Sequence, residues 1–225
     1  MVVNIYVEGG VINGNVEATT NNNSEALREE LNRFLQRALN RNDISIIVKK
    51  CSGYKEAAKQ FINAKDNDED YLFVDLDRKP ELRGEWFKSL SDDGIEMPQD
   101  KTFHVYFWIQ EMEAWFLKQP EAIELWAKDE NLIRKPGQDY LLAEHHSIKD
   151  KDIEHLQHKA SSLLSVILRQ VFAPKEKVKS AAGKVREFKY GKLRHAPGII
   201  AHLNPSDLIL KDNELKSFCE KVSNG

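Results

Sequence analysis

Residues 2–10, VVNIYVEGG, form the stretch that decides the fold. Their β-branched and aromatic side chains predict a buried strand, which stops where Glu8 is followed by Gly9 and Gly10. Apolar residues then recur at helical spacing, namely Leu27, Leu31, Phe34, Leu35 and Ala38. Ile44–Val48 (ISIIV) predicts a second strand, followed by helical spacing through Phe61. Strand, helix, strand, helix is typical of a parallel sheet built from βαβ units.

The same pattern extends toward the middle of the chain. Tyr71–Val74 (YLFV) predicts a third strand and Phe103–Ile109 (FHVYFWI) a fourth. We expect residues 78–101, which carry Pro80, Gly84, Gly94 and Pro98, to be mostly loop around a short helical piece. Further helices are expected over 113–118, from 120 through 126, over 153–172 as the longest apolar-periodic helix, and from 204 to the C-terminus.

These elements predict an α/β protein with a mostly parallel, Rossmann-like sheet of about four strands, flanked by helices, and a mainly helical C-terminal part. We expect a core over residues 1–118 and a helical extension over 119–225 packed on it, together forming one globular unit. Of the 225 residues, 41% are hydrophobic and 31% charged, which is ordinary for a folded protein.

The lengths of the apolar runs and the two cysteines predict where in the cell the protein is located. The longest apolar runs are far shorter than a bilayer span, and the N-terminus has no basic region followed by a long apolar stretch. Cys51 and Cys219 form no CxxC pair, so we expect two buried thiols in a reducing compartment. The expected protein is soluble and cytoplasmic, with no membrane partner.

Acidic residues follow two of the predicted strands. Glu8 ends the first, and Asp75 and Asp77 follow the third. The carboxyl ends of parallel strands gather functional groups, and residues two apart on a strand share a face, with Leu76 turned toward the core. Crowded carboxylates require a proton or a cation, and Mg²⁺ or Mn²⁺ suits oxygen ligands. Taken separately, Glu8 fits a solvated turn and the acidic pair fits a helix cap or loop; together they favour a metal site.

Several motifs carry a resemblance to a known family. Strand, Glu-Gly, helix, strand, then strand and Asp-x-Asp resembles the Toprim pattern of topoisomerases, bacterial primases and the nucleases of the "overcoming lysogenization defect" type. IYVEGG, VKKCSGYKEA, FVDLD, QEMEAWFL and KYGKLRHAPGIIAHLNP together resemble an uncharacterised Toprim-like group of bacterial proteins. Members of that group are often encoded beside an AAA or SMC-like ATPase in presumed phage-defence loci.

The resemblance implies roles for individual residues. It makes Glu8 the Toprim glutamate, Asp75 and Asp77 the Asp-x-Asp pair, and Glu113 the glutamate of the MEAWF motif, all four as catalytic residues and the first three as metal ligands. The group places a histidine seven residues before that glutamate; this chain has Tyr106 there. The chain also lacks the acid that many Toprim nucleases carry soon after the Glu-Gly turn.

The basic tail and the glycine turn are the expected substrate contacts. Residues 151–200 hold eleven Lys or Arg against four Asp or Glu, leaving +7 there and −10 elsewhere. Within this tail Lys192, Arg194 and His195 are expected to contact a phosphate backbone, and Gly9 and Gly10 to let the substrate approach Glu8. The alternative of equal weight is that the tail motif only docks the C-terminal segment onto the sheet.

Two functions of different classes follow from these features. The first is a Mg²⁺- or Mn²⁺-dependent nuclease acting on DNA or RNA, including transfer RNA, as the effector of an anti-phage defence system. No GxxxxGK[ST] run occurs, so we expect that this chain does not itself bind ATP in a P-loop. The resemblance implies a separately encoded AAA or SMC-like ATPase as partner, and an oligomer of the chain is also compatible with the sequence. The second is a non-catalytic subunit that binds nucleic acid or regulates such an ATPase.

Overall fold

Four parallel strands form the central sheet of the described chain, in the order β2-β1-β3-β4. The computed structural model describes residues 1–9, 18–64, 69–175 and 188–224, and the side chains of 18–22 lie outside the description. The strands are β1 Val2–Glu8, β2 Ser45–Cys51, β3 Glu69–Asp75 and β4 Val105–Trp108. A parallel sheet flanked by helices confirms the predicted fold class.

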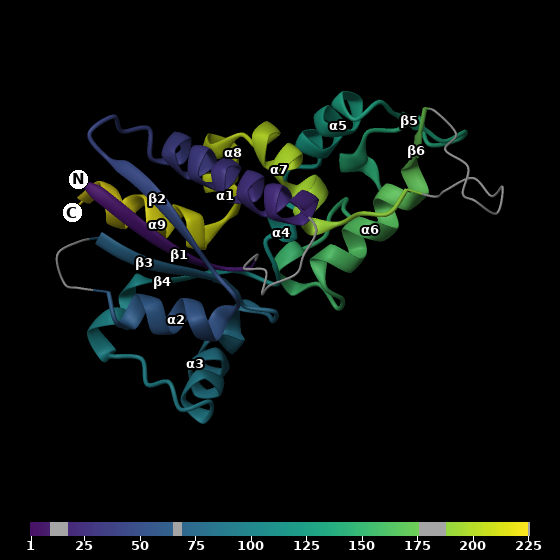
Figure 1. Ribbon diagram of the computed structural model, residues 1–225. Coiled ribbons are helices and arrows are strands. Elements are labelled where there is room, and N and C mark those ends of the chain that lie inside the picture. The colour runs from purple at the N-terminus through teal and green to yellow at the C-terminus, as the bar shows by residue number, and fades with distance from the viewer. Residues whose placement is uncertain (10–17, 65–68, 176–187, 225) are drawn as a thin grey trace.

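Helices cover both faces of this sheet (Figure 1). Helix α1 (Ala18–Leu39) connects β1 to β2 on one face, and α2 (Tyr54–Ile62) connects β2 to β3 on the other, beside α3 (Arg83–Asp92). The chain thus leaves β1 in one direction and returns past it in the other. This reversal places a topological switch point between β1 and β3, where open α/β sheets collect ligands.

Alternating side chains of the strands supply two apolar cores. Val3, Ile5 and Val7 pack toward α1, whereas Tyr6 packs toward α2 with Leu72 of β3. Leu76 is buried in the second core, as the sequence predicts. Both cysteines are free and buried.

The C-terminal part is mainly helical, as predicted, and packs on the α1 side. Its helices are α4 Glu113–Lys118, α5 Pro120–Asp129, α6 Ala160–Val171, α7 Lys192–His202, α8 Pro205–Lys211 and α9 Asn213–Asn224. Strand β5 (Leu132–Arg134) follows α5, and strand β6 (Phe172–Pro174) follows α6. The two strands form a small antiparallel pair. Short 3₁₀ turns are η1 Pro80–Leu82, η2 Gln99–His104, η3 Leu142–Glu144 and η4 Ile153–His155. Within the described ranges, no helix combines the length and apolar character needed to cross a bilayer.

Residues 78–101 are more helical than expected. Helix α3 covers ten of them, flanked by η1 and the start of η2, so the prediction of mostly loop is wrong. Trp86 and Leu90 lie one helical turn apart and are both buried, with the Trp86 ring 5.2 Å from that of Phe107. Burial of this face in the second core stabilises a helix that local composition does not favour.

The fourth strand is shorter than predicted. Phe103 belongs to η2 and is 69% exposed. His104 Nδ1 lies 3.1 Å from the Asp70 carbonyl oxygen, and its ring stacks on Tyr71. A side chain therefore occupies the position that a strand amide would need to extend the ladder.

The helix predicted over 153–172 is also shorter at both ends. Ile153–His155 is a 3₁₀ turn, α6 begins at Ala160, and Phe172 pairs with Arg134 in the small sheet. The Glu111 carboxylate accepts a hydrogen bond from the Ser161 amide at 2.9 Å. A residue distant in sequence therefore caps the helix start, which local sequence cannot reveal.

A buried ionic network ties α9 to α4. Lys118 Nζ lies 2.7 Å from Asp212 Oδ2 and 2.7 Å from Glu154 Oε1, and the Asp212 side chain is 1% exposed. Trp115 Nε1 donates to the same Asp212 oxygen at 2.9 Å. The other oxygen of Asp212 accepts from the Leu215 amide at the start of α9. One carboxylate thus neutralises a buried lysine and caps a helix.

We predict that Asp212→Ala lowers the free energy of unfolding by about 3–5 kcal/mol, because it leaves the Lys118 ammonium buried with one partner fewer. Urea denaturation followed by circular dichroism measures this change. Lys216→Ala, which removes an exposed lysine of α9, should cost about 0.5 kcal/mol or less. Equal stabilities of the two variants would contradict the assignment.

Candidate active site

Asp75 occupies the centre of the candidate site, at the end of β3. It follows Phe73 by two residues, so its side chain points to the α1 face of the sheet. The carboxylate is 9% exposed; Oδ1 accepts from the Met112 amide at 2.9 Å and Oδ2 from Lys192 Nζ at 3.0 Å. Both oxygens are therefore held in fixed positions.

Glu8 reaches Asp75 from the neighbouring strand. Strands β1 and β3 are paired with Val7 beside Phe73, so Glu8 and Asp75 leave the sheet at nearly the same level. Burial raises the pKa of Glu8 to about 8, and the charge of Asp75 and a hydrogen bond between the two carboxyl groups add to this increase. Glu8 therefore retains its proton at neutral pH.

Glu113, the first residue of α4, adds a third carboxylate. It is 1% exposed, and Oε1 accepts from the Tyr190 hydroxyl at 3.1 Å. Oε2 is buried and has no hydrogen-bond partner among the described residues, although Lys192 Nζ lies 3.6 Å away. Burial raises the pKa of Glu113 above its ordinary value, while the charge of Lys192 opposes that shift. A divalent cation would therefore stabilise the charged form of Glu113 more than the Lys192 ammonium does at this distance.

Lys192, the first residue of α7, supplies positive charge to these acids. Burial works against the ammonium form, but Asp75, Glu113 and Glu8 together keep the pKa of Lys192 above its ordinary value. Its side chain is still 40% exposed. The charged amine can thus be approached from outside, and we name Glu8, Asp75, Glu113 and Lys192 the carboxylate–lysine cluster.

Asp77 lies outside this cluster. Its carboxylate is 51% exposed and bonds Lys159 Nζ at 2.6 Å, and Lys159 also lies 3.5 Å from Glu111. The prediction that strand geometry continues through Asp77 is wrong. Strand β3 ends at Asp75, and Asp77 adopts a left-handed backbone with φ of 57°. The Asp75 and Asp77 carboxylates therefore bond different lysines, although the charge of Asp77 still adds to the raised pKa of Glu8.

Unusual backbone conformations surround the site. Gly9 has φ of 100°, which favours glycine, and its amide donates to the Cys51 carbonyl at 3.0 Å. Gln110 also has positive φ, 67°, and its carbonyl accepts from the Asp77 amide at 2.7 Å. Residues held in such conformations cluster at functional sites. Gly10, the second predicted glycine, lies outside the described residues.

Arg194 and His195, which were also predicted to contact a phosphate backbone, differ in their exposure to solvent. His195 is 4% exposed; its Nδ1 accepts from the Gly191 amide, and its ring packs against Trp126 and Phe188. Burial, with Arg194 adding, lowers the pKa of His195 to about 4, so the ring is neutral at pH 7. Its geometry fits the docking alternative, whereas Arg194 is exposed and Lys192 lies in the cluster.

Tyr190 and Lys159 also bond acidic residues of the site, and neither was predicted as a site residue. Tyr190 stands inside the quoted KYGKLRH motif, two residues before Lys192, so its motif was a usable signal. Lys159 carries no local signal, because its pairing with Asp77 joins residues far apart in the chain.

The residues suit a divalent metal by their chemistry. The carboxyl groups of Glu8 and Asp75 share a hydrogen bond, and the Glu113 Oε2 atom is buried with no hydrogen-bond partner among the described residues. Mg²⁺ ordinarily takes one or two carboxylates with water and phosphate oxygens, so Glu8 and Asp75 fit as its protein ligands. Across the described ranges, no group of three or more His, Cys, Asp and Glu side chains is already arranged to hold a metal.

The fold and site define an α/β protein with acidic groups converging at the switch point of a parallel sheet. A family model matches residues 23–223, and the chain belongs to that family, described as "Domain of unknown function (DUF4276)". Comparisons with curated proteins and with solved structures find no match.

We predict a pH-dependent stability that is specific to Glu8. Its pKa of about 8 in the folded protein exceeds its ordinary value of 4.5, so between these pH values the folded state holds a proton that the unfolded state releases. Stability from this group is therefore present at low pH and is lost as pH rises toward 8. Glu8→Gln avoids that loss.

The measurement is the melting temperature in EDTA at about pH 5 and about pH 8.5. Relative to wild type, Glu8→Gln should gain stability at the higher pH, whereas the exposed control Glu121→Gln should show no such trend. Parallel pH profiles for wild type and Glu8→Gln would show that Glu8 titrates normally.

Proposed function

We propose that this protein is a metal-dependent nuclease of Toprim type that hydrolyses phosphodiester bonds in DNA or RNA. The observation that carries the proposal is the convergence of Glu8, Asp75 and Glu113 around Lys192 at the β1–β3 switch point. The Toprim relationship is supported by Glu-Gly after β1 and Asp-x-Asp after β3, on adjacent parallel strands. The family description assigns no activity, so chemistry alone supports this function.

The residues of the cluster divide into complementary roles. Asp75, fixed through the Met112 amide and Lys192, is the most rigid metal ligand. Glu8 is a second ligand or, with its pKa near 8, a group that accepts and returns a proton near neutral pH. A bound Mg²⁺ or Mn²⁺ would supply charge neutralisation at the phosphate and an activated water. Lys192, partly exposed, holds a phosphate oxygen beside these acids.

Glu113 and Asp77 have supporting roles in this proposal. Glu113 accepts a hydrogen bond from the Tyr190 hydroxyl and lies beside the Lys192 ammonium. Its proposed role is to position Lys192 rather than to contact the substrate. Asp77 stands next to the cluster but is bonded to Lys159. Its contribution to metal binding would require exchange of that ion pair, so we expect a smaller role than for Asp75.

The biological setting that we propose comes from the resemblance stated above. The nuclease would act as the effector of a bacterial anti-phage system, in the cytoplasm, under control of a separately encoded AAA or SMC-like ATPase. Activity would then depend on the partner, and a purified chain alone would show lower turnover than the pair.

We predict that purified wild type, with and without the neighbouring ATPase, cleaves at least one of plasmid DNA, single-stranded DNA and transfer RNA in Mg²⁺ or Mn²⁺. Asp75→Ala and Glu8→Ala should lower the rate by about 10- to 100-fold, because loss of groups that hold a metal or its ligands has effects of that size. Asp77→Ala should lower it less. The readout is gel-resolved cleavage over time.

The exposed variant Glu121→Ala is the matched control and should retain the wild-type rate. No cleavage by wild type under any of these conditions would contradict the proposed function. Equal cleavage by wild type, Asp75→Ala and Glu8→Ala would remove the site assignment instead.

A second candidate is a non-catalytic subunit that binds nucleic acid or regulates the ATPase. The specific observation in its favour is that Lys192 already neutralises the carboxylates through a 3.0 Å bond to Asp75. In that case the cluster is a structural ion network joining α7 to the sheet, and metal affinity would be negligible.

Metal affinity separates the two candidates. We predict that Lys192→Met binds Mn²⁺ at least about tenfold more tightly than wild type, because removing a cation a few ångströms away leaves the carboxylates uncompensated. The same variant should cleave more slowly, since the phosphate contact is lost. Isothermal titration calorimetry measures the affinity.

Asp75→Asn is the control for that titration and should abolish Mn²⁺ binding. Undetectable Mn²⁺ binding by both wild type and Lys192→Met, with both proteins folded, would favour the non-catalytic subunit.

A further inference from the structure

One side of α6 exposes a stripe of residues that do not pack into the core. Ser162, Val166 and Arg169 are exposed and recur at helical spacing, whereas Leu164 and Leu168 face the core. Val166 is 37% exposed although it is β-branched and apolar. The stripe thus offers an apolar centre with a cation at its C-terminal end.

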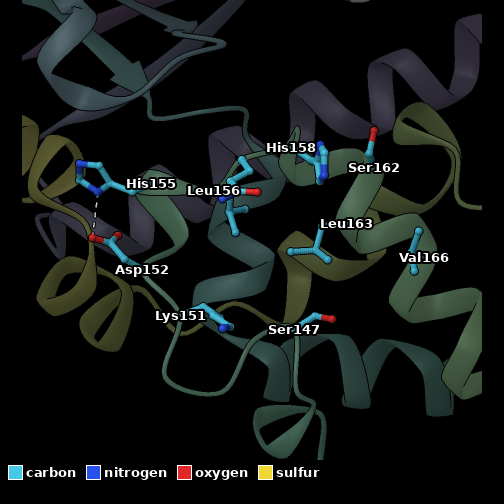
Figure 2. A pocket seen from close by; sticks show the side chains of 10 residues that line it. Ser147, Lys151, Asp152, His155, Leu156, His158, Ser162, Leu163 and Val166 are labelled. Carbon is cyan, nitrogen blue, oxygen red and sulfur yellow. Dashed lines mark hydrogen bonds and ion pairs between the residues drawn. The ribbon is translucent and has the colours of Figure 1, made fainter.

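Two cavities lie along this stripe. The larger, of about 650 Å³, is lined by Leu156, His158, Ser162, Leu163 and Val166, among others, and Figure 2 shows these side chains around it. The smaller, of about 340 Å³, is lined by Val166, Arg169, Phe188, Lys189 and Tyr190, with Ser165. Val166 lines both cavities, and we name the two together the α6 groove.

The charge around the groove is mainly positive. Residues 155–175 and 188–206 of the described chain contain no Asp or Glu. They contain six Lys or Arg, namely Lys159, Arg169, Lys175, Lys189, Lys192 and Arg194. Lys159 and Lys192 are paired with acidic residues, whereas Arg169 and Lys189 line the smaller cavity. Asp152 lines the larger cavity but is paired with His155 at 2.8 Å, as Figure 2 shows. An anionic ligand therefore fits this groove better than a cationic or neutral one.

Two residues connect the groove to the carboxylate–lysine cluster. Tyr190, which lines the smaller cavity, donates its hydroxyl to Glu113 at 3.1 Å. Lys159, next to His158 of the larger cavity, bonds Asp77 beside the site. A polymer lying in the groove would consequently reach the cluster.

We propose that the α6 groove binds single-stranded nucleic acid and leads it to the carboxylate–lysine cluster. Arg169 and Lys189 contact phosphates, while Val166, Leu163 and Phe188 contact bases. Apolar and aromatic side chains between cations suit unstacked bases, whose faces a duplex would hide. This inference rests on the proposed function for the choice of a nucleic acid, and it adds the path and the strandedness of the substrate.

The test is binding measured in EDTA, where a metal-dependent nuclease cannot cleave. Fluorescence anisotropy would follow labelled single-stranded DNA and RNA of about 16 nucleotides, and a duplex of the same sequence. We expect wild type to bind a single strand more tightly than the duplex. Arg169→Ala/Lys189→Ala should weaken single-strand binding at least about tenfold and reduce the slope of log affinity against log salt by about 1.4.

Two further variants distinguish binding in the α6 groove from nonspecific attraction to positive surface charge. Lys216→Ala/Lys221→Ala removes the same charge from exposed residues of α9, remote from the groove, and should bind like wild type. Val166→Asp places a negative charge at the centre of the groove while leaving the buried face of α6 intact, and should bind less than wild type. Circular dichroism and melting temperature show whether each variant is folded.

Equal loss by the two double variants, wild-type binding by folded Val166→Asp, or tighter binding of the duplex would overturn the proposal. The readout is independent of the proposed function. Groove-dependent binding without cleavage would refute only the nuclease, whereas cleavage that survives the groove variants would refute only the groove.

Discussion

The repulsion among three acidic side chains is the constraint on which this structure depends. Glu8 and Asp75 leave adjacent parallel strands at the same edge of the sheet, and Glu113 begins the helix that follows β4. Their charges are balanced in two ways: a proton is held on Glu8, whose pKa is raised, and the ammonium of Lys192 bonds Asp75. Because Lys192 begins α7, the C-terminal helices complete the site rather than merely cover the sheet.

The packing of α7 shows how that lysine reaches the sheet. Helix α7 lies against α1 and α5, and a Cβ on Gly198 would come 2.6 Å from Trp126 Cδ1. Only glycine therefore allows this close approach of α7 to α5. His195, buried between Trp126 and Phe188, adds to the same interface as a neutral ring. The basic tail thus contains residues that dock α7 and one charged residue, Lys192, that lies at the site. The docking interpretation describes His195, whereas the position of Lys192 is compatible with the predicted phosphate contact.

Local patterns predicted the elements that their own residue spacing or capping residues mark. Strands β1, β2 and β3 and helices α1, α4, α5 and α8 were predictable, because apolar spacing or a capping Asn204 marks them directly. Helix α3 was not predictable in this way, since the residue that its buried face packs against, Phe107, lies in strand β4. The start of α6 depends on Glu111 in the same way. Each missed boundary is set by a partner distant in the chain.

The sequence alone determined that the protein is an α/β molecule with Glu8, Asp75 and Glu113 at the ends of strands or the start of a helix. That much follows from side-chain periodicity and turn residues, which are local properties. Only the tertiary structure decided that Lys192 joins these acids, that Asp77 turns to Lys159, and that His195 is buried. The reason is that charge pairing and burial depend on which distant segments meet, and a left-handed residue after β3 redirects a carboxylate that strand alternation would have aimed inward.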